Sequence, residues 1–95
     1  MLSRPALAAL VAACRKTFGL QQARLATDLG LSPAALSHME TTRSAISERF
    51  LSAFAERLFG ERDASTFIEL VHEAHDDDID EIAYFAFPSE PEVFT

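Results

Sequence analysis

Small hydrogen-bonding and methyl-bearing side chains occupy a stretch of the sequence where we expect a short exposed helix. Ser37 can both donate and accept a hydrogen bond, and His38 can donate to N7 or O6 of a guanine. The methyl groups of Ala34 and Ala35 suit contact with the methyl group of a thymine. Such side chains can read base edges in double-stranded DNA, although none of them makes a bidentate contact. We therefore expect specificity to depend also on contacts outside this helix or on DNA shape.

Catalytic and metal-binding chemistry is not indicated by the rest of the sequence. No arrangement of serine, histidine and acid stands out, and no glycine-rich phosphate-binding loop is present. His72 and His75 have a spacing that a metal ion could use on one helix face, but no cysteine or third firm ligand is near them in the sequence. We interpret both as solvated side chains. We expect no catalytic residue, no metal site, no cofactor and no enzymatic activity.

Residues 21–40 are predicted to form two short helices joined by a tight turn, and this pair positions the DNA-reading side chains. Leu25, Ala26 and Leu29 recur at helical spacing and give the first helix an inward face. Gly30 suits the turn, because only glycine adopts a positive φ at little cost. After it, Ser32 can cap a second helix at its N-terminus. That helix then begins at a proline, which loses no hydrogen bond in the first turn.

In this register the stretch resembles the phage-repressor and Cro-like (XRE-type) helix-turn-helix family of transcriptional regulators. The resemblance covers roughly residues 4–62, about two thirds of the chain. It is carried by Gln22, Leu25-Ala26, Leu29-Gly30-Leu31-Ser32, Leu36 and Glu40. It implies an ion pair between Arg15, late in the first helix, and Glu40. The sequence departs from the family after Glu40, where Thr41-Thr42 stands in place of the common Asn-Gly turn, so the path of the next loop stays open.

The resemblance also implies which residues meet DNA. The second helix of the motif enters the major groove, and the residues around it contact the phosphate backbone. Pro33, Ala34, Ala35, Ser37 and His38 are the expected base contacts. Gln21, Gln22, Ser32, Thr41, Thr42 and Arg43 are the expected phosphate contacts.

The net charge of −7 hides an asymmetry between two parts of the chain. Residues 1–62 contain all eight basic residues and five acidic residues, which gives +3. Residues 63–95 contain ten acidic residues and no basic residue, which gives −10. Because +3 is a modest charge, we expect only moderate non-specific affinity for DNA.

Hydrophobic spacing predicts an all-α fold, a compact five-helix repressor-like bundle with a short acidic C-terminal extension. The expected helices span residues 4–17, 21 or 22 to 28, 33–41, 47–59 and 64–75. We expect residues 1–75 to form the DNA-binding domain and residues 76–95 the extension. In the extension, the spacing fits a short helix over 78–85, and an alternating pattern over 82–87 leaves a strand open.

Two roles remain open for the acidic extension. A helix-turn-helix protein commonly binds two half-sites as a homodimer, and Ile82, Tyr84, Phe85 and Phe87 could pack across a two-fold axis. The same residues could instead bind a basic protein, as in small antitoxins that cover a toxin with an acidic segment.

The sequence thus predicts a homodimeric DNA-binding regulator, an autorepressor reading an inverted repeat through residues 33–41. The alternative is the antitoxin of a toxin–antitoxin pair. We expect a cytoplasmic protein with no membrane association, because no apolar stretch is long enough for a signal peptide or a membrane span. The single cysteine, Cys14, falls on the apolar side of the first helix, so we expect a buried thiol rather than a redox sensor.

Overall fold

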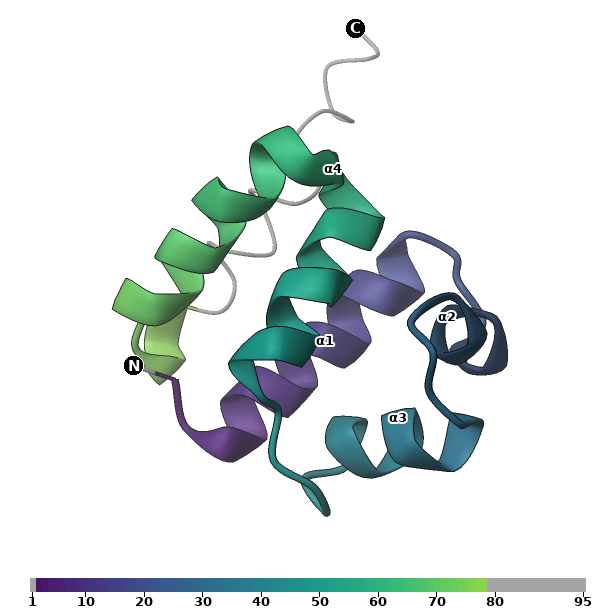
Figure 1. Ribbon diagram of the computed structural model, residues 1–95. Helices are drawn as coiled ribbons and strands as arrows, with labels where there is room; N and C mark the ends of the chain where they lie inside the picture. The colour runs from purple at the N-terminus through teal and green to yellow at the C-terminus, as the bar shows by residue number, and fades with distance from the viewer. Residues whose placement is uncertain (1, 79–95) are drawn as a thin grey trace, which may run out of the picture.

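The computed structural model describes residues 2–78, and within this range it contains helices joined by turns and loops, with no strand (Figure 1). The all-α fold class expected from the sequence is confirmed for this part of the chain. The elements in order are α1 (Arg4–Thr17), α2 (Gln22–Asp28), α3 (Pro33–Glu40), α4 (Glu48–Glu73) and a 3₁₀ turn (Asp76–Asp78).

Three serines fix where the longer helices begin. Ser3, Ser32 and Ser47 precede α1, α3 and α4, and each hydroxyl accepts a hydrogen bond from the backbone N–H three residues later, at 3.0–3.2 Å. Each bond satisfies one of the N–H groups that a helix leaves without an internal partner. Pro5 and Pro33 lie in the first turns of α1 and α3, where their missing N–H groups cost nothing.

The turn between α2 and α3 depends on Gly30. Its φ is +75°, which a residue with a side chain adopts only at a cost. The backbone N–H of Leu31 then donates to the carbonyl oxygen of Ala26 at 2.8 Å, which closes the end of α2. This bond holds α3 at a fixed angle to α2.

The core lies between α1, the α2–α3 pair and α4. Its largest fully buried side chains are Leu10, Val11, Cys14, Leu25, Leu36, Phe54 and Phe67. The burial expected for Cys14 is confirmed, and desolvation raises the pKa of its thiol to about 12. A thiol that stays protonated at neutral pH is a poor nucleophile, so Cys14 is a packing residue.

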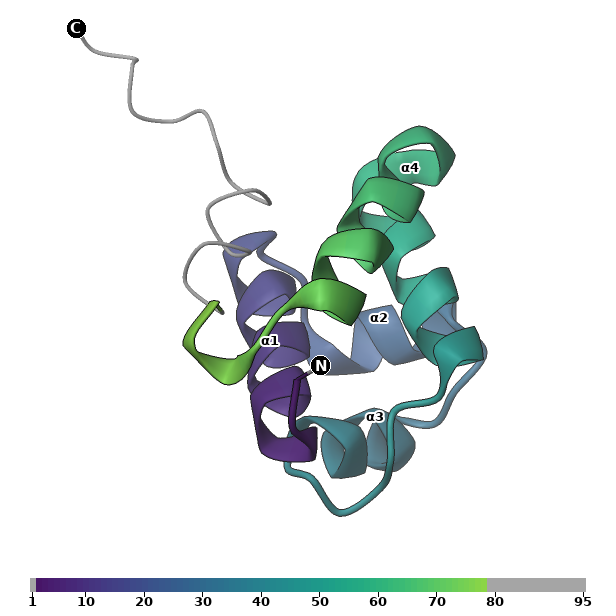
Figure 2. The same ribbon diagram turned by 90° about the vertical axis from the view of Figure 1, so that its left-hand side faces the viewer.

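Helix α4 is broken at Gly60, whose φ of +85° and ψ of +161° fall in a region essentially restricted to glycine. After the break the chain turns back, and its second segment ends beside the start of α1 (Figures 1 and 2). The sequence predicted separate helices over 47–59 and 64–75 and therefore five in all. The structure has helical segments on both sides of Gly60, but the second resumes at residue 61, directly after the glycine. The two segments therefore form one element, α4, and the described chain has four α-helical elements, so the five-helix count is not confirmed.

The end of the described chain is tied to its beginning. One carboxylate oxygen of Asp76 accepts from the backbone N–H of Ser3 and the other accepts from its hydroxyl, both at 2.8 Å. These bonds hold the pKa of Asp76 below its ordinary value. The helix or strand expected after residue 78, with the proposed surface Ile82, Tyr84, Phe85 and Phe87, lies outside the described residues.

Candidate nucleic-acid interface

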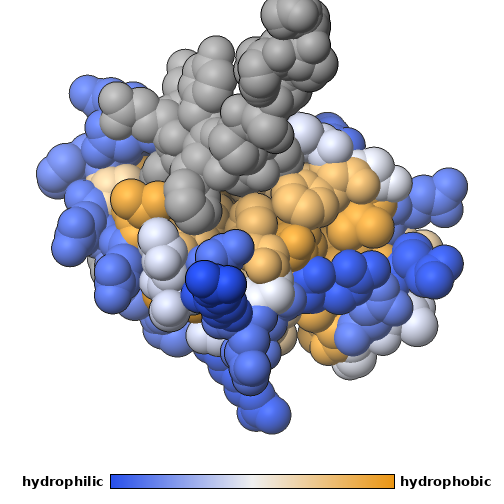
Figure 3. Space-filling model, turned by 90° about the horizontal axis from the view of Figure 1, so that it is seen from above, coloured by the Kyte–Doolittle hydropathy of each residue, from blue (hydrophilic) through white to orange (hydrophobic). Residues whose placement is uncertain are grey.

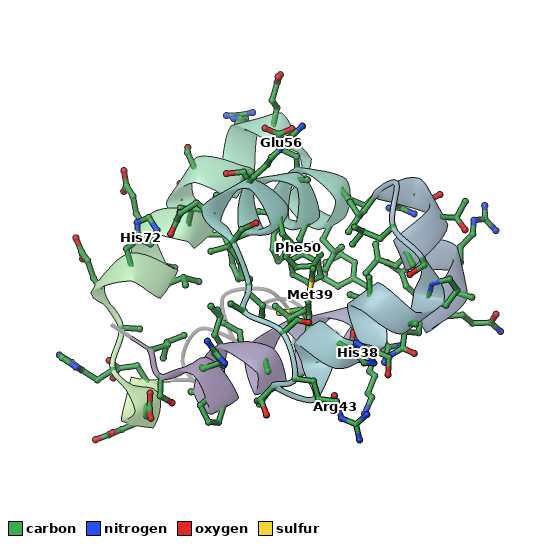
Figure 4. The ribbon with its side chains drawn as sticks, turned by 60° about the horizontal axis from the view of Figure 1, so that its bottom comes forward. His38, Met39, Arg43, Phe50, Glu56 and His72 are labelled. Carbon is green, nitrogen blue, oxygen red and sulfur yellow. The ribbon has the colours of Figure 1, made fainter. Side chains whose placement is uncertain are left out.

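Helix α3 has one side in the core and one side toward solvent. Leu36 is fully buried, and Met39 is half-buried with its side chain directed toward Phe50 of α4 (Figure 4). The opposite side carries the five residues expected to contact bases: Pro33, Ala34 and His38 are exposed, and Ala35 and Ser37 are half-buried. The structure therefore brings these residues together on one accessible helix face.

The residues expected to contact phosphates lie around this face and differ in how exposed they are to solvent. Gln21, Ser32, Thr41 and Arg43 are exposed, and Gln22 and Thr42 are half-buried. Arg43 and His38 both point away from the body of the molecule on the same side (Figure 4). The backbone N–H of Arg43 donates to the carbonyl oxygen of His38 at 2.8 Å, which holds the arginine next to the end of α3.

Two of the expected phosphate contacts already use their hydroxyl hydrogens within the protein. The Thr41 hydroxyl donates to the carbonyl oxygen of Ser37 at 2.8 Å, and that of Thr42 donates to the carbonyl oxygen of Thr41. A phosphate oxygen can only accept hydrogen bonds, so either threonine must rotate its hydroxyl away from this bond to contact DNA. Arg43 and Gln21 need no such change.

A buried network beneath α3 joins the three helices of the motif region. Glu40 accepts two hydrogen bonds from Arg15, from Nε at 2.7 Å and from Nη2 at 3.0 Å. Only 11% of the Arg15 side chain and 5% of the Glu40 side chain are exposed. Arg15 Nη1 also donates to the carbonyl oxygen of Leu20 at 2.8 Å. The structure thus contains the ion pair that the resemblance implied, as a two-pronged contact between α1 and α3.

Gln22 belongs to the same network, which the sequence alone did not indicate. Its Nε2 donates to Glu40 Oε1 at 3.0 Å. The amide therefore keeps one N–H and its carbonyl oxygen for other partners, and its orientation is fixed by a buried carboxylate. The only available signal was that Gln22 and Glu40 both occupy positions of the resembled motif.

The loop after α3 contains one residue in the left-handed region of the backbone. Thr42 has a φ of +65°, the only positive φ of a non-glycine residue among residues 2–78. A β-branched side chain is strained in this region, because its Cβ approaches the backbone. The sequence left the path of this loop open. The structure shows that a threonine adopts the left-handed turn despite its cost.

The two histidines of α4 and the following turn do not form a metal site in the described chain. His72 Nε2 lies 3.0 Å from each carboxylate oxygen of Glu48, so it joins the two ends of the broken helix. Within residues 2–78 no group of three or more His, Cys, Asp or Glu side chains is arranged to hold a metal ion. In the same range no helix has the length and apolar character that crossing a membrane requires.

Comparison with known families decides what this arrangement is. A family model described as a helix-turn-helix domain matches residues 6–63, which is more than half of the chain. The chain belongs to the helix-turn-helix domain family. No curated protein and no solved structure matches it.

Membership of the helix-turn-helix family is consistent with the phage-repressor and Cro-like resemblance, since the match includes α2, the Gly30 turn and α3. It indicates a DNA-binding regulator, and proteins of this family are typically not enzymes. The matched range ends shortly after Gly60, so the second segment of α4 lies almost entirely beyond it.

Proposed function

We propose that this helix-turn-helix protein is a sequence-specific transcriptional regulator that places α3 in the major groove of double-stranded DNA. The observation that carries the proposal is the division of α3 between a buried side at Leu36 and an accessible side at Ala34 and His38. A groove-reading helix needs both, because the buried side holds it rigid and the accessible side meets base edges.

The proposed contacts fall into two groups. Pro33, Ala34, Ala35, Ser37 and His38 meet base edges, and of their side chains only those of Ser37 and His38 can donate a hydrogen bond. Gln21, Gln22, Ser32, Thr41, Thr42 and Arg43 meet phosphates and set the register. The Glu40 carboxylate supports this second group by orienting the Gln22 amide at 3.0 Å.

We further propose a homodimer that acts as an autorepressor on an inverted repeat. Two-fold symmetry would place the two copies of α3 in successive major grooves, with half-site centres about 34 Å apart. Residues 1–75 form the DNA-binding domain in this proposal, and residues 76–95 supply the dimer surface with Ile82, Tyr84, Phe85 and Phe87.

A second candidate function is the antitoxin of a toxin–antitoxin pair, which is favoured by the −10 charge of residues 63–95. In the described part of this acidic region, Asp63, Glu69, Glu73, Asp76 and Asp77 are all exposed. They are therefore accessible to a basic protein. A small basic protein that copurifies with the chain at low salt and is released at high salt would favour this candidate over the autorepressor alone.

Selection from a random duplex library, followed by fluorescence anisotropy on the selected site, tests the regulator proposal. Arg43→Ala should weaken binding to every sequence and reduce the slope of log affinity against log salt by about 1. The matched control is Arg62→Ala, which removes the same charge from an exposed residue of the second α4 segment and should leave the slope unchanged. His38→Ala should instead cost about 1–3 kcal/mol on the selected site and relax the preference at one position.

The comparison of variants requires that the wild-type chain binds duplex DNA. If the wild-type chain binds no duplex at low salt and selection enriches no sequence, the regulator proposal is wrong. Analytical ultracentrifugation of the DNA complex separately tests the two-to-one stoichiometry that a homodimer on an inverted repeat requires.

A further inference from the structure

A hollow of about 360 Å³ lies between the turn that joins α2 to α3, helix α3 and the start of α4. Its wall includes Leu29 and Leu31 of the turn, Met39 of α3 and Phe50 of α4. The Met39 side chain is directed toward Phe50 (Figure 4). We call this space the α3–α4 hollow. Its volume lies in the range that sites for small molecules commonly have.

The wall of the α3–α4 hollow is largely apolar and partly accessible. Leu29, Leu31 and Met39 pack against the core, yet each side chain is half-buried rather than buried. Apolar surface in contact with water costs free energy, and an apolar occupant removes that cost. A sugar or a nucleotide does not suit this wall, because its polar groups would find few hydrogen-bond partners there.

Apolar exposure is not confined to this hollow. Seen from above, the molecule carries a band of hydrophobic residues with hydrophilic residues along its rims (Figure 3). Apolar atoms are common on protein surfaces, so a band of this kind does not by itself indicate a ligand. The α3–α4 hollow differs because it is concave and because a cation lies at its wall.

Arg49 is the only charged residue among the described residues that line the hollow. It is exposed and forms no ion pair within residues 2–78, whereas Arg15, Arg24 and Arg57 each pair with a carboxylate. A guanidinium can bind a carboxylate through two parallel hydrogen bonds, so one arginine neutralises one carboxylate. The hollow therefore offers a single counter-charge beside an apolar wall.

Ser47 adds a hydrogen-bond donor at the same wall. Its hydroxyl oxygen accepts from the backbone N–H of Phe50 at 3.0 Å, which leaves the hydroxyl hydrogen for another acceptor. A carboxylate only accepts hydrogen bonds, so it matches both Ser47 and Arg49. The neighbouring Glu48 does not line the hollow, and its carboxylate lies 3.0 Å from Nε2 of His72 instead.

We propose that the α3–α4 hollow binds a small carboxylate with an apolar body. The carboxylate pairs with Arg49 and Ser47, and the body packs between the turn, α3 and α4. This inference does not rest on DNA binding, because every residue that it uses is in place in the free protein. The occupant contacts Met39 on the core side of α3 and leaves the opposite side, with Ala34 and His38, uncovered.

Titration of the full chain with phenylbutyrate, followed by two-dimensional amide NMR, tests the site. The backbone N–H signals of Gly30, Leu31, Arg49 and Ala53 should shift and saturate together, with a dissociation constant on the order of a millimolar or lower. Phenylbutyramide has the same apolar body without the charge, and it should bind about fivefold more weakly. The absence of a saturable shift, or saturable shifts confined to other parts of the chain, would overturn the proposal.

A pair of arginine variants tests the charge contact. Arg49→Ala should weaken the binding of phenylbutyrate about fivefold and leave that of phenylbutyramide unchanged. The matched control is Arg62→Ala, which removes the same charge from an exposed residue of the second α4 segment and should change neither affinity. Equal losses in the two variants would show that Arg49 does not pair with the carboxylate, and the proposal would then be wrong.

A pair of leucine variants tests the position of the apolar body. Ala53 lines the hollow, so Ala53→Leu should fill part of it and weaken the binding of both compounds severalfold. Ala9→Leu makes the same change at an exposed position of α1 and should have no effect. All four substituted residues are exposed, so the variants should fold, and the same NMR spectra verify this. Unchanged affinity in Ala53→Leu would place the compounds outside the hollow and refute the assignment.

Discussion

Replacing one member of the Arg15–Glu40 ion pair should destabilise this protein more than any substitution at its surface. Both side chains are nearly excluded from solvent, at 11% and 5% exposure, and the removal of either leaves the other as a buried charge without its counter-ion. Breaking a buried pair in this way costs about 3–5 kcal/mol. A domain of this size has a total stability of about 5–15 kcal/mol, so a single substitution consumes a large part of it.

The contacts around the pair predict which single variant costs more. In Arg15→Met, the carboxylate of Glu40 stays buried with only the Gln22 amide as a donor, and the carbonyl oxygen of Leu20 loses its partner. In Glu40→Leu, the guanidinium keeps its bond to Leu20 and its long side chain can move its charge toward water. We therefore expect Arg15→Met to lie at the upper end of the range and Glu40→Leu to cost less.

The double variant separates the pair from the general effect of mutation. With both charges removed, only the Leu20 carbonyl and the Gln22 amide lose partners, so the double variant should fall about 1–3 kcal/mol below wild type. Because the two single losses sum to at least about 6 kcal/mol, the coupling energy should be at least about 3 kcal/mol. Urea unfolding followed by far-ultraviolet circular dichroism measures all four proteins. If the double variant is as unstable as the two single losses added together, Arg15 and Glu40 do not act as a buried unit and the reasoning is wrong.

Two further predictions concern Thr42, in the loop after α3, and Asp76, near the end of the described chain. Thr42→Gly should stabilise the fold by about 1 kcal/mol, because glycine removes the strain of a positive φ. Glycine also makes the unfolded chain more flexible, but this offsets only part of the gain. Thermal unfolding measures the change, and a lower melting temperature would contradict the assignment of strain to Thr42. Asp76→Asn should lower stability at neutral pH, because the bonds from Ser3 favour the carboxylate and hold its pKa below the unfolded value. The loss should vanish as the pH falls through the lowered pKa of Asp76, where the wild-type carboxyl is itself protonated. A gap between wild type and Asp76→Asn that stays constant down to that pH would show that the charge of Asp76 is not responsible.

The helix proposed to enter the DNA groove, α3, could be located from sequence because its determinants are local. Ser32 caps α3, Pro33 begins it, and Gly30 supplies the preceding turn, so the identities of three nearby residues set the start of the helix. The expected range of 33–41 exceeds the observed helix by one residue, Thr41, which is its C-cap. Hydrophobic spacing also placed Leu36 correctly on the buried side.

The break in α4 shows the limit of the same local reasoning. Gly60 was expected to stop a helix, and it does interrupt one. Sequence spacing could not tell how the second segment lies against the first. In the structure the Phe67 ring packs against the Phe59 ring across the break, a contact that exists only once the chain has turned back.

The sequence by itself therefore determined the helical class, the helix-turn-helix register and the side chains that face outward on α3, since capping, turn formation and helical periodicity act over a few residues. Only the tertiary structure decided that Gln22 shares the carboxylate of Glu40, that Asp76 binds Ser3 and that Thr42 accepts a left-handed turn. The first two join residues far apart in the chain, and the third is a local strain held in place by the surrounding fold. Distances between such residues, and the strain they tolerate, exist only once the core has formed.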